Sequence, residues 1–386
     1  MGCSGHTPGV QDAATHDAGS PTVEAGGADG TTEDARPTSE ASVQDVVVSS
    51  DGGTDASADG AADARTDAVM DGGCPTDGGV PNDLACTGLY GDWPSKTIAA
   101  DVTAYTPAFV LWSDGAQKSR WFYLPAGTQI DTSDMDDWVF PVGTKFWKEF
   151  VVGGQTIETR LISKGVSQWN LLDYRWSSDG TSATLLTTGE TNVNGTTYEI
   201  PSTTECYTCH AGRTDMVLGF DLIGLGTSGA QGVTLADLAG QGRLTQPPPA
   251  TTITIPEDST GNAAAALGYM HVNCGVTCHN TNMYADALVT GYFTKLLAAQ
   301  LYPDGGTGHV TQLDPYTTAV NVPATVMPGQ MQYLRILPGD AAQSLVPLMA
   351  LARDPDAGNF IPMPPIVSHQ PDTTGVAAIQ AWINAL

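Results

Sequence analysis

Hydrophobic and polar residues alternate differently along three regions of the chain. Up to residue 83 large apolar residues are sparse, and the first aromatic residue is Tyr90. Beyond it, residues 120–124, 145–152 and 156–162 are short runs of aromatic and β-branched residues, separated by turns rich in Pro and Gly. Such runs, partly alternating between polar and apolar positions, are typical of half-buried strands. We therefore expect a β-rich domain over 84–205, built as an antiparallel sandwich or barrel.

Two further patterns in this region and the next predict local structure. Asn194-Gly195, flanked by residues that favour strands, predicts a hairpin with a two-residue turn. Thr234 is placed to cap a helix that starts at Leu235, and residues 262–270 form an alanine-rich helical segment. At the C-terminus, Asp372 or Thr373 is placed to cap a helix with one apolar face. That face consists of Val376, Ile379, Trp382, Ile383 and Leu386.

Residues 1–83 have the composition of a disordered acidic tether. They are rich in Asp, Ala, Gly, Thr and Ser, and Arg36 and Arg65 are the only Lys or Arg residues among them. Low hydrophobicity with high net charge prevents a chain from burying enough surface to fold. The whole chain has a net charge of −27, which argues against nucleic acid as a partner because binding it requires a basic face. No apolar run in the sequence is long enough for a transmembrane helix.

Two short motifs carry the candidate chemistry. Cys206 and Cys209 with His210 form C-x-x-C-H, and Cys274 and Cys278 with His279 form the same pattern with one extra residue. C-x-x-C-H is the attachment signature of haem c. Its two thiols add to the two vinyl groups of the haem, and the adjacent imidazole binds the iron. Cysteines three or four residues apart share one face of a helix, so both spacings fit this chemistry.

Other interpretations of the cysteines stay open. Cys206 and Cys209 could be a C-x-x-C redox pair. Cys274 and Cys278 could form a small disulfide loop, or could join the first pair in a four-cysteine zinc site. The histidine that directly follows each second cysteine favours two covalent haems c.

The sixth ligands are less clearly marked. Met363, in the proline-stiffened segment 359–365, is a good sixth ligand for the haem at His279 because a thioether is soft and neutral. A packing role is the alternative, with Met327 and Met349 as lesser candidate ligands. Met216 and His271 are further candidates. The candidate partners for the haem carboxylates are Arg160, Arg175 and Arg213.

The remaining cysteines indicate a secreted setting. Of seven cysteines, Cys74 and Cys86 are left to bridge each other, as an oxidising compartment permits. Cys3 follows a small residue, like the acylated cysteine of a lipoprotein, although no charged and apolar signal segment precedes it. We expect that the sequence begins inside the signal peptide and that lipid is attached at Cys3. An unmodified cysteine near a true start is the alternative.

The chain resembles a bacterial family of uncharacterised di-haem c-type cytochromes, in which a β-rich domain precedes two haem motifs. The resemblance covers nearly all of the chain after residue 84. It rests on the following segments in the family's order: 111–116, 140–144, 148–150, 158–161, 174–176, 200–202, 270–274, 338–340, 363–365 and 382–383. It implies haem binding and electron transfer, without a substrate. The extra residue before Cys278 departs from the family's second motif, so a single thioether or no attachment at Cys274 is an alternative.

These observations predict a multidomain α+β protein. After the tether and the β-rich domain, 206–262 would hold the first motif and a linker, and 263–386 would form a helical domain like cytochrome c. The expected function is electron transfer in the cell envelope, by a periplasmic or cell-surface lipoprotein anchored to the outer membrane by lipid alone. Its partner would be a redox protein or a small oxidant or reductant. The alternative function is a haem-dependent oxidoreductase with one open haem, peroxidase-like or substrate-oxidising; an interaction protein with structural disulfides is a third interpretation.

Overall fold

The computed structural model describes residues 74, 76–77, 79–280, 308–324, 332–353, 360–365 and 367–386. These residues all belong to one compact unit. The predicted lipidation site Cys3, nearly all of the predicted tether and the candidate ligand Met327 lie outside the described residues.

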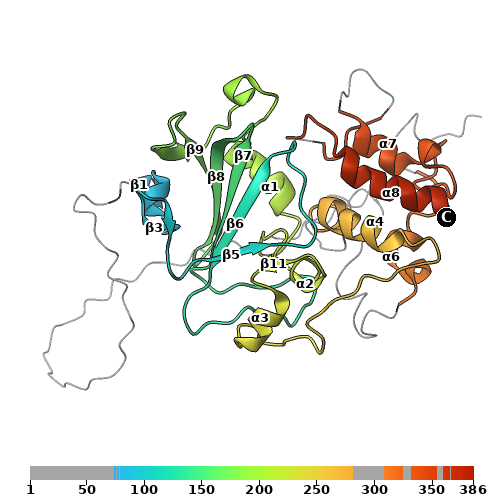
Figure 1. Cartoon of the computed structure of the whole chain (residues 1–386), viewed down its shortest axis with the longest axis horizontal. Coiled ribbons are helices and arrows are strands. Elements are labelled where there is room, and N and C mark those ends of the chain that lie inside the picture. Colours follow the sequence, from blue (N-terminus) through green and yellow to red (C-terminus); the bar gives the residue numbers. More distant parts are fainter. Residues whose placement is uncertain are drawn as a thin grey trace, which may run out of the picture. The chain divides into compact units, whose positions relative to one another are not determined.

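A seven-stranded sheet dominates the first half (Figure 1), with strand order β10-β9-β8-β7-β6-β5-β11. Every neighbouring pair in it is antiparallel. The three predicted strands are confirmed as β6, β7 and β8. The strands are β5 (Thr103–Thr106), β6 (Gln117–Tyr123), β7 (Lys145–Val152), β8 (Gln155–Lys164), β9 (Trp169–Trp176), β10 (Ala183–Leu186) and β11 (Gln231–Gly232).

An antiparallel β region is therefore confirmed, but its strands form one open sheet instead of a sandwich or barrel. The other sheets among the described residues have two strands each, β1 (Thr76–Asp77) with β2 (Val80–Pro81), and β3 (Tyr90–Asp92) with β4 (Thr97–Ile98). One face of the large sheet is covered by the later half of the chain: Phe122 and Phe146 share a core with Phe220. A second sheet is not needed to bury that face.

The predicted hairpin at Asn194-Gly195 is wrong. Residues Val193–Gly195 form a short 3₁₀ turn, η2, and the only strand-like pairing nearby is a single bridge between Glu190 and Ile200. Val193 is fully buried with Tyr198 and Ile200. Burial of these side chains folds the segment into a compact loop, overriding the local preference for a tight turn.

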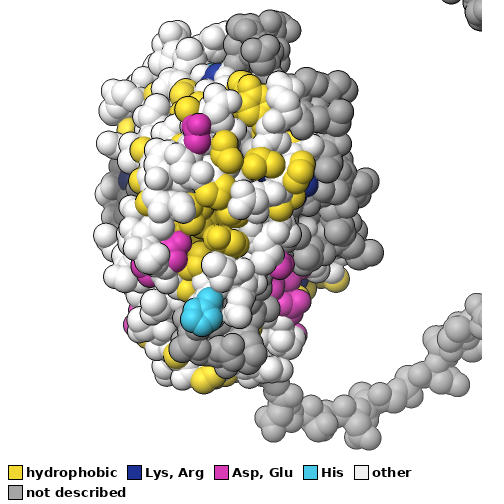
Figure 2. All heavy atoms as spheres, turned by 90° about the vertical axis from the view of Figure 1, so that its right-hand side faces the viewer, with side chains coloured by type: hydrophobic (Ala, Val, Ile, Leu, Met, Phe, Trp, Pro, Cys, Tyr) yellow, Lys and Arg dark blue, Asp and Glu magenta, His cyan; other side chains and the backbone are white. Residues whose placement is uncertain are grey.

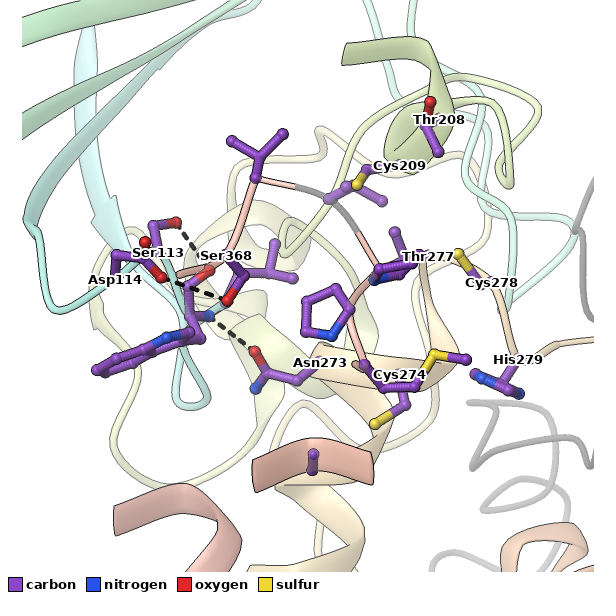
Figure 3. Close-up of a pocket in the computed structure, with 18 of the residues that line it drawn as sticks. Ser113, Asp114, Thr208, Cys209, Asn273, Cys274, Thr277, Cys278, His279 and Ser368 are labelled. Atoms are coloured by element: carbon purple, nitrogen blue, oxygen red, sulfur yellow. Dashed lines mark hydrogen bonds between the residues drawn. The ribbon is translucent and has the colours of Figure 1, made fainter. Parts of the chain in front are cut away.

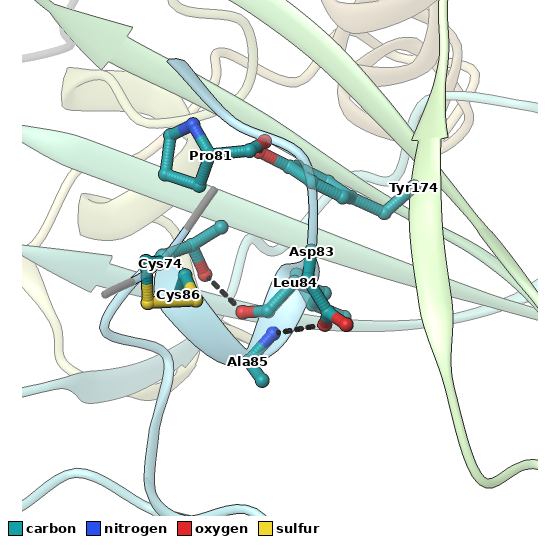
Figure 4. Close-up of a disulfide and its surroundings, with 8 residues drawn as sticks. Cys74, Pro81, Asp83, Leu84, Ala85, Cys86 and Tyr174 are labelled. Atoms are coloured by element: carbon teal, nitrogen blue, oxygen red, sulfur yellow. Dashed lines mark hydrogen bonds between the residues drawn. A yellow bond between two sulfur atoms is a disulfide. The ribbon is translucent and has the colours of Figure 1, made fainter. Parts of the chain in front are cut away.

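The residues just before the sheet are folded onto it (Figure 4). A disulfide joins Cys74 and Cys86, and the Tyr174 hydroxyl of β9 donates to the Pro81 carbonyl at 2.9 Å. Asp83 forms a bridge with Thr184 of β10. The last residues of the predicted tether are thus part of the folded unit.

The second half of the described chain contains helices separated by loops. Thr234 caps α3 as predicted, and Asp372 caps α8 by accepting from the Gly375 amide. The helices are α1 (Thr203–His210), α2 (Leu222–Gly226), α3 (Leu235–Gly240), α4 (Ala263–Met270), α6 (Asp314–Thr317), α7 (Leu345–Leu351) and α8 (Thr373–Ala385), with short turns η1 (Leu84–Cys86), η3 (His271–Gly275, a π-helix), η5 (Val310–Gln312) and η6 (Ala341–Gln343).

Helix α8 packs against α4, the helix that leads into the second motif. Its predicted apolar face is confirmed, since Val376, Ile379, Trp382 and Ile383 are at most 1% exposed. The crossing is close, because a Cβ added to Gly375 would overlap the ring of Tyr269.

The surface of the helical side carries both hydrophobic and charged side chains (Figure 2). Figure 2 views the molecule from the right-hand side of Figure 1, where hydrophobic side chains gather near the centre and acidic ones are more prominent than basic ones. Within the described ranges, no helix has the length and apolar character needed to cross a membrane.

Candidate functional site

The first motif lies on α1, whose start is fixed by a capping box. The Ser202 hydroxyl accepts from the Glu205 amide, and the Glu205 carboxylate accepts from the Ser202 amide at 2.8 Å. The helix packs against β9, where the Cys206 sulfur lies 3.7 Å from the Asp173 carboxylate. Cys206, Cys209 and His210 line one cavity.

The imidazole of His210 is held in one tautomer. Its Nδ1 lies 2.5 Å from the Met216 carbonyl oxygen. Because a carbonyl can only accept, Nδ1 carries the proton and Nε2 keeps its lone pair. The pKa of His210 is lowered to about 4, mainly by burial; the Met216 hydrogen bond opposes this shift, and the charges of Lys148 and Arg160 add to it. A neutral imidazole whose second nitrogen is fixed by a backbone carbonyl is the usual arrangement of a metal-ligating histidine.

The second motif absorbs its extra residue in a π-helical turn. Helix α4 continues into η3, where the Val276 amide donates to the His271 carbonyl five residues back (2.9 Å). The His279 amide likewise donates to the Cys274 carbonyl (2.8 Å). One residue inserted into an α-helix produces this wider turn, which is frequent at functional sites. The insertion is thus accommodated in the backbone, and Cys274, Cys278 and His279 all line the cavity.

Both motifs line the same cavity, which has a volume of about 280 Å³. Figure 3 shows Cys209 on one side of it, with Cys274, Cys278 and His279 on the other. The backbones behind them touch, because a Cβ added to Gly212 would overlap the carbonyl oxygen of Thr277. The fold therefore brings together two motifs that lie more than sixty residues apart in sequence.

The residues of the two motifs are compatible with covalent haem, which requires free thiols. All four motif cysteines are free thiols. Among the described residues, no three His, Cys, Asp or Glu side chains converge as a metal ion would require. Burial also raises the pKa of Cys206 and of Cys209.

Two methionines, Met349 and Met363, line the cavity together with both motifs. Met363 is anchored by its backbone: its amide donates to the Met349 carbonyl at 3.0 Å, and its carbonyl accepts from Arg353 at 3.3 Å. Met349 lines the cavity from α7. The backbone of Met363 is thus fixed in the wall of the cavity, hydrogen-bonded to that of Met349.

The two other candidate ligands do not line the cavity. Met216 contributes its carbonyl to His210, while His271 is buried with its Nε2 at 3.7 Å from Asp221. Burial would raise the pKa of Asp221, but the hydrogen bond and charge of His271 bring it below its ordinary value. His271 in η3 therefore lies next to Asp221, the residue that caps α2.

The basic residues around the cavity differ from those singled out in the sequence. Arg160 lines it, whereas Arg175 pairs with Glu190 at 2.8 Å and Arg213 pairs with Asp137 at 3.5 Å. Lys148, Arg335 and Arg353 line the cavity as well. The alternation of β7 contained a signal for Lys148, because this residue shares a face with Phe146 and Phe150. Arg335 and Arg353 come from segments without such periodicity.

Comparison of the chain with family models, with curated proteins and with solved structures finds no match.

Proposed function

We propose that this protein is a di-haem c-type cytochrome that transfers electrons in the cell envelope. One observation carries the proposal: two Cys-Cys-His sets line a single cavity, and His210 has its Nδ1 proton held by a backbone carbonyl. Haem bound there would supply one-electron chemistry. The protein would supply the thiols, the two histidines and, for the second haem, the thioether of Met363.

Each group of residues has a defined task in this proposal. Cys206 and Cys209 hold one haem and Cys274 and Cys278 the other, while the Met216 carbonyl orients His210. Apolar side chains such as Leu218 and Ile379 line the same cavity and exclude water. The cavity, at about 280 Å³, is near the lower end of ligand-pocket volumes.

An envelope location has independent support. The disulfide between Cys74 and Cys86 is of a kind that persists in oxidising compartments. Haem attachment and a disulfide are compatible in the periplasm or at the cell surface. Lipid at Cys3, anchoring the chain to the outer membrane, completes the proposal, and the electron partner would be a redox protein or a small molecule.

The test is intact mass together with a pyridine-haemochrome assay, after expression of the full chain with a haem-attachment system. The wild-type mass should exceed that of the polypeptide by two haem groups. Cys206→Ala with Cys209→Ala should remove one haem, and Cys278→Ala should remove or weaken the other. Cys74→Ser with Cys86→Ser is the control, which should keep both haems. A wild-type mass without haem would reject the proposal.

A second candidate function is a haem-dependent oxidoreductase. It is favoured by the positions of Met216 and His271, the candidate sixth ligands for the first haem, because neither lines the cavity. A first haem without a protein ligand on its sixth position could bind a small oxidant such as peroxide. The optical spectrum decides: a high-spin component supports catalysis, and low-spin bands for both haems support electron transfer.

A further inference from the structure

A row of charged side chains crosses one face of the sheet beside the first motif. Arg120 of β6 lies opposite Lys148 of β7, and Lys148 lies opposite Arg160 of β8. Arg160 in turn lies opposite Asp173 of β9, whose carboxylate neighbours the Cys206 sulfur. Neighbouring strands are about 4.8 Å apart, and like charges directly opposite each other are destabilising. Three adjacent cations in a sheet interior therefore require an explanation.

The two carboxylates nearest the row, Glu158 and Asp173, both pair with Arg160. Arg160 donates to both oxygens of Glu158, at 2.7 and 2.9 Å, and lies 3.3 Å from Asp173. Glu158 also accepts from the Tyr198 hydroxyl at 2.5 Å. Both acids are almost fully buried, Glu158 at 0% and Asp173 at 2% exposed. They pair with Arg160 and leave the other two basic residues of the row without an ion pair to any residue that the structure describes.

Arg120 and Lys148 are the cations left over. Arg120 is 5% exposed, and its Nη2 has no hydrogen-bond partner in the described part of the chain. Lys148 makes no hydrogen bond or ion pair with any described residue. Burial, together with the charges of Arg120, Lys118 and Arg160, lowers the pKa of Lys148 well below its ordinary value. A buried cation is costly unless it is paired, so the row has the charge and the geometry of an incomplete anion site.

We propose that Arg120, Lys148 and Arg160 form a carboxylate-binding site in the wall of the cavity, beside Cys206, Cys209 and His210. Lys148 and Arg160 line the cavity together with these motif residues, and Arg120 supports Lys148 from the next strand. Two sources supply this chemistry: the two carboxylates of a haem attached at the first motif, or a small free carboxylate bound next to it. The first source rests on the proposed function; the second does not.

The experiment compares the full-length holoprotein with Lys148→Gln, with Lys148→Arg and with a matched control, Lys145→Gln. Lys145 lies on the same strand, but its Nζ donates to the Thr87 carbonyl on the opposite side of the sheet. The readouts are the resonance Raman bending band of the haem carboxylates, the midpoint potential of the first haem, and titration with acetate at constant ionic strength. Arg120→Gln is the second variant if Lys148→Gln does not fold.

Each outcome decides the matter. If haem carboxylates fill the site, Lys148→Gln shifts the bending band and lowers the midpoint potential, because an unpaired carboxylate stabilises ferric iron. A tenfold change in the ferric/ferrous equilibrium corresponds to 59 mV. Lys148→Arg restores both readouts and Lys145→Gln changes neither. If a free carboxylate fills it, the band stays in place, while wild type binds acetate saturably and Lys148→Gln does not. No band shift and no saturable acetate binding would overturn the proposal.

Failure of the proposed function is distinguishable from failure of this inference. A wild-type chain that carries no haem by mass rejects the proposed function alone. Acetate is then titrated against the thermal unfolding of that haem-free chain, since a ligand that binds only the folded state raises its stability. Saturable stabilisation that is lost in Lys148→Gln supports the site, and its absence in wild type rejects it.

Discussion

The two motifs present the same ligands from different scaffolds. The first lies on a capped α-helix against the sheet, beside buried charges such as Glu158 and Asp173. The second lies on a π-helical turn between helices, where Met363 and Met349 face the same cavity. If both motifs attach haem as proposed, the difference teaches that this chemistry fixes only the short spacing of Cys and His. The surroundings of each site are free to differ.

Different surroundings predict different redox behaviour. Thioether ligation stabilises ferrous iron, so a haem at His279 ligated by Met363 should have the higher potential. The first site combines His210, whose pKa is lowered, with a row of basic residues, and its candidate ligand Met216 does not line the cavity. An electron would then move from the first haem to the second. The following variants are ordered by the size of their expected effect on this comparison.

Trp382→Ala tests whether the two halves unfold together. Trp382 is fully buried, and its indole donates to Asp258 at 2.9 Å, so we expect a loss of about 3–5 kcal/mol. The core joins the sheet face to α4 and α8, so thermal unfolding followed at both haems should remain a single transition at a lower temperature. Trp382→Phe, which keeps most of the packing, should lose less. Two separate transitions would show that the halves are independent.

Glu158→Gln tests the buried charges behind the first motif. Breaking its pair with Arg160 leaves a buried cation without its main partner, at a cost of about 3 kcal/mol. The matched control is Glu190→Gln, because Glu190 pairs with Arg175 but is 38% exposed, and such pairs contribute about 0–1 kcal/mol. Denaturant unfolding of both variants gives the comparison. Equal losses would mean that the buried pair contributes no more than the exposed one.

Met363→Ala tests the second site alone. If its sulfur binds the iron, the variant loses the near-infrared band of Met–ferric ligation, and the potential of that haem falls. Met363→His should also lower the potential while keeping the haem six-coordinate. The spectrum of the haem at His210 should be unaffected in both. Met349→Leu is the control, and if it alone removes the band, Met349 is the ligand.

Local patterns predicted the elements that local interactions determine. The strands β6, β7 and β8, the Thr234 and Asp372 caps and the buried face of α8 depend on residues near one another in sequence. The hairpin at Asn194 failed because distant burial of Val193 and Tyr198 outweighed a local turn preference. The single open sheet could not be inferred either, since its face is covered by residues from the other half of the chain.

For the site, the ligand types were readable and their setting was not. The π-helical turn continues from α4, which is closely packed on both sides. A Cβ added to Gly268 of α4 would overlap Phe109, and one added to Gly375 of α8 would overlap Tyr269 of α4. The orientation of His210 depends on a backbone carbonyl, which no side-chain pattern reveals. Lys148 was visible as an inward residue of β7. It has no ion pair among the described residues because Arg160, opposite it on β8, pairs with Glu158 and Asp173.

Asp258→Asn is the smallest and most specific test of the helical side. Burial would raise the pKa of Asp258, but hydrogen bonds from Thr260 and Trp382 bring it below its ordinary value. A carboxyl whose pKa is lower in the folded state adds stability above its unfolded pKa, about 3.9, and loses it as the pH falls through the folded value. At pH 7 the variant should be less stable by about 1 kcal/mol, since the Trp382 bond then goes to a neutral acceptor. Denaturant unfolding between pH 7 and pH 3 should show this difference shrink as Asp258 takes up its proton. A difference that stays constant over that range would mean that the charge of Asp258 does not stabilise α8, and that the shape of the side chain alone matters.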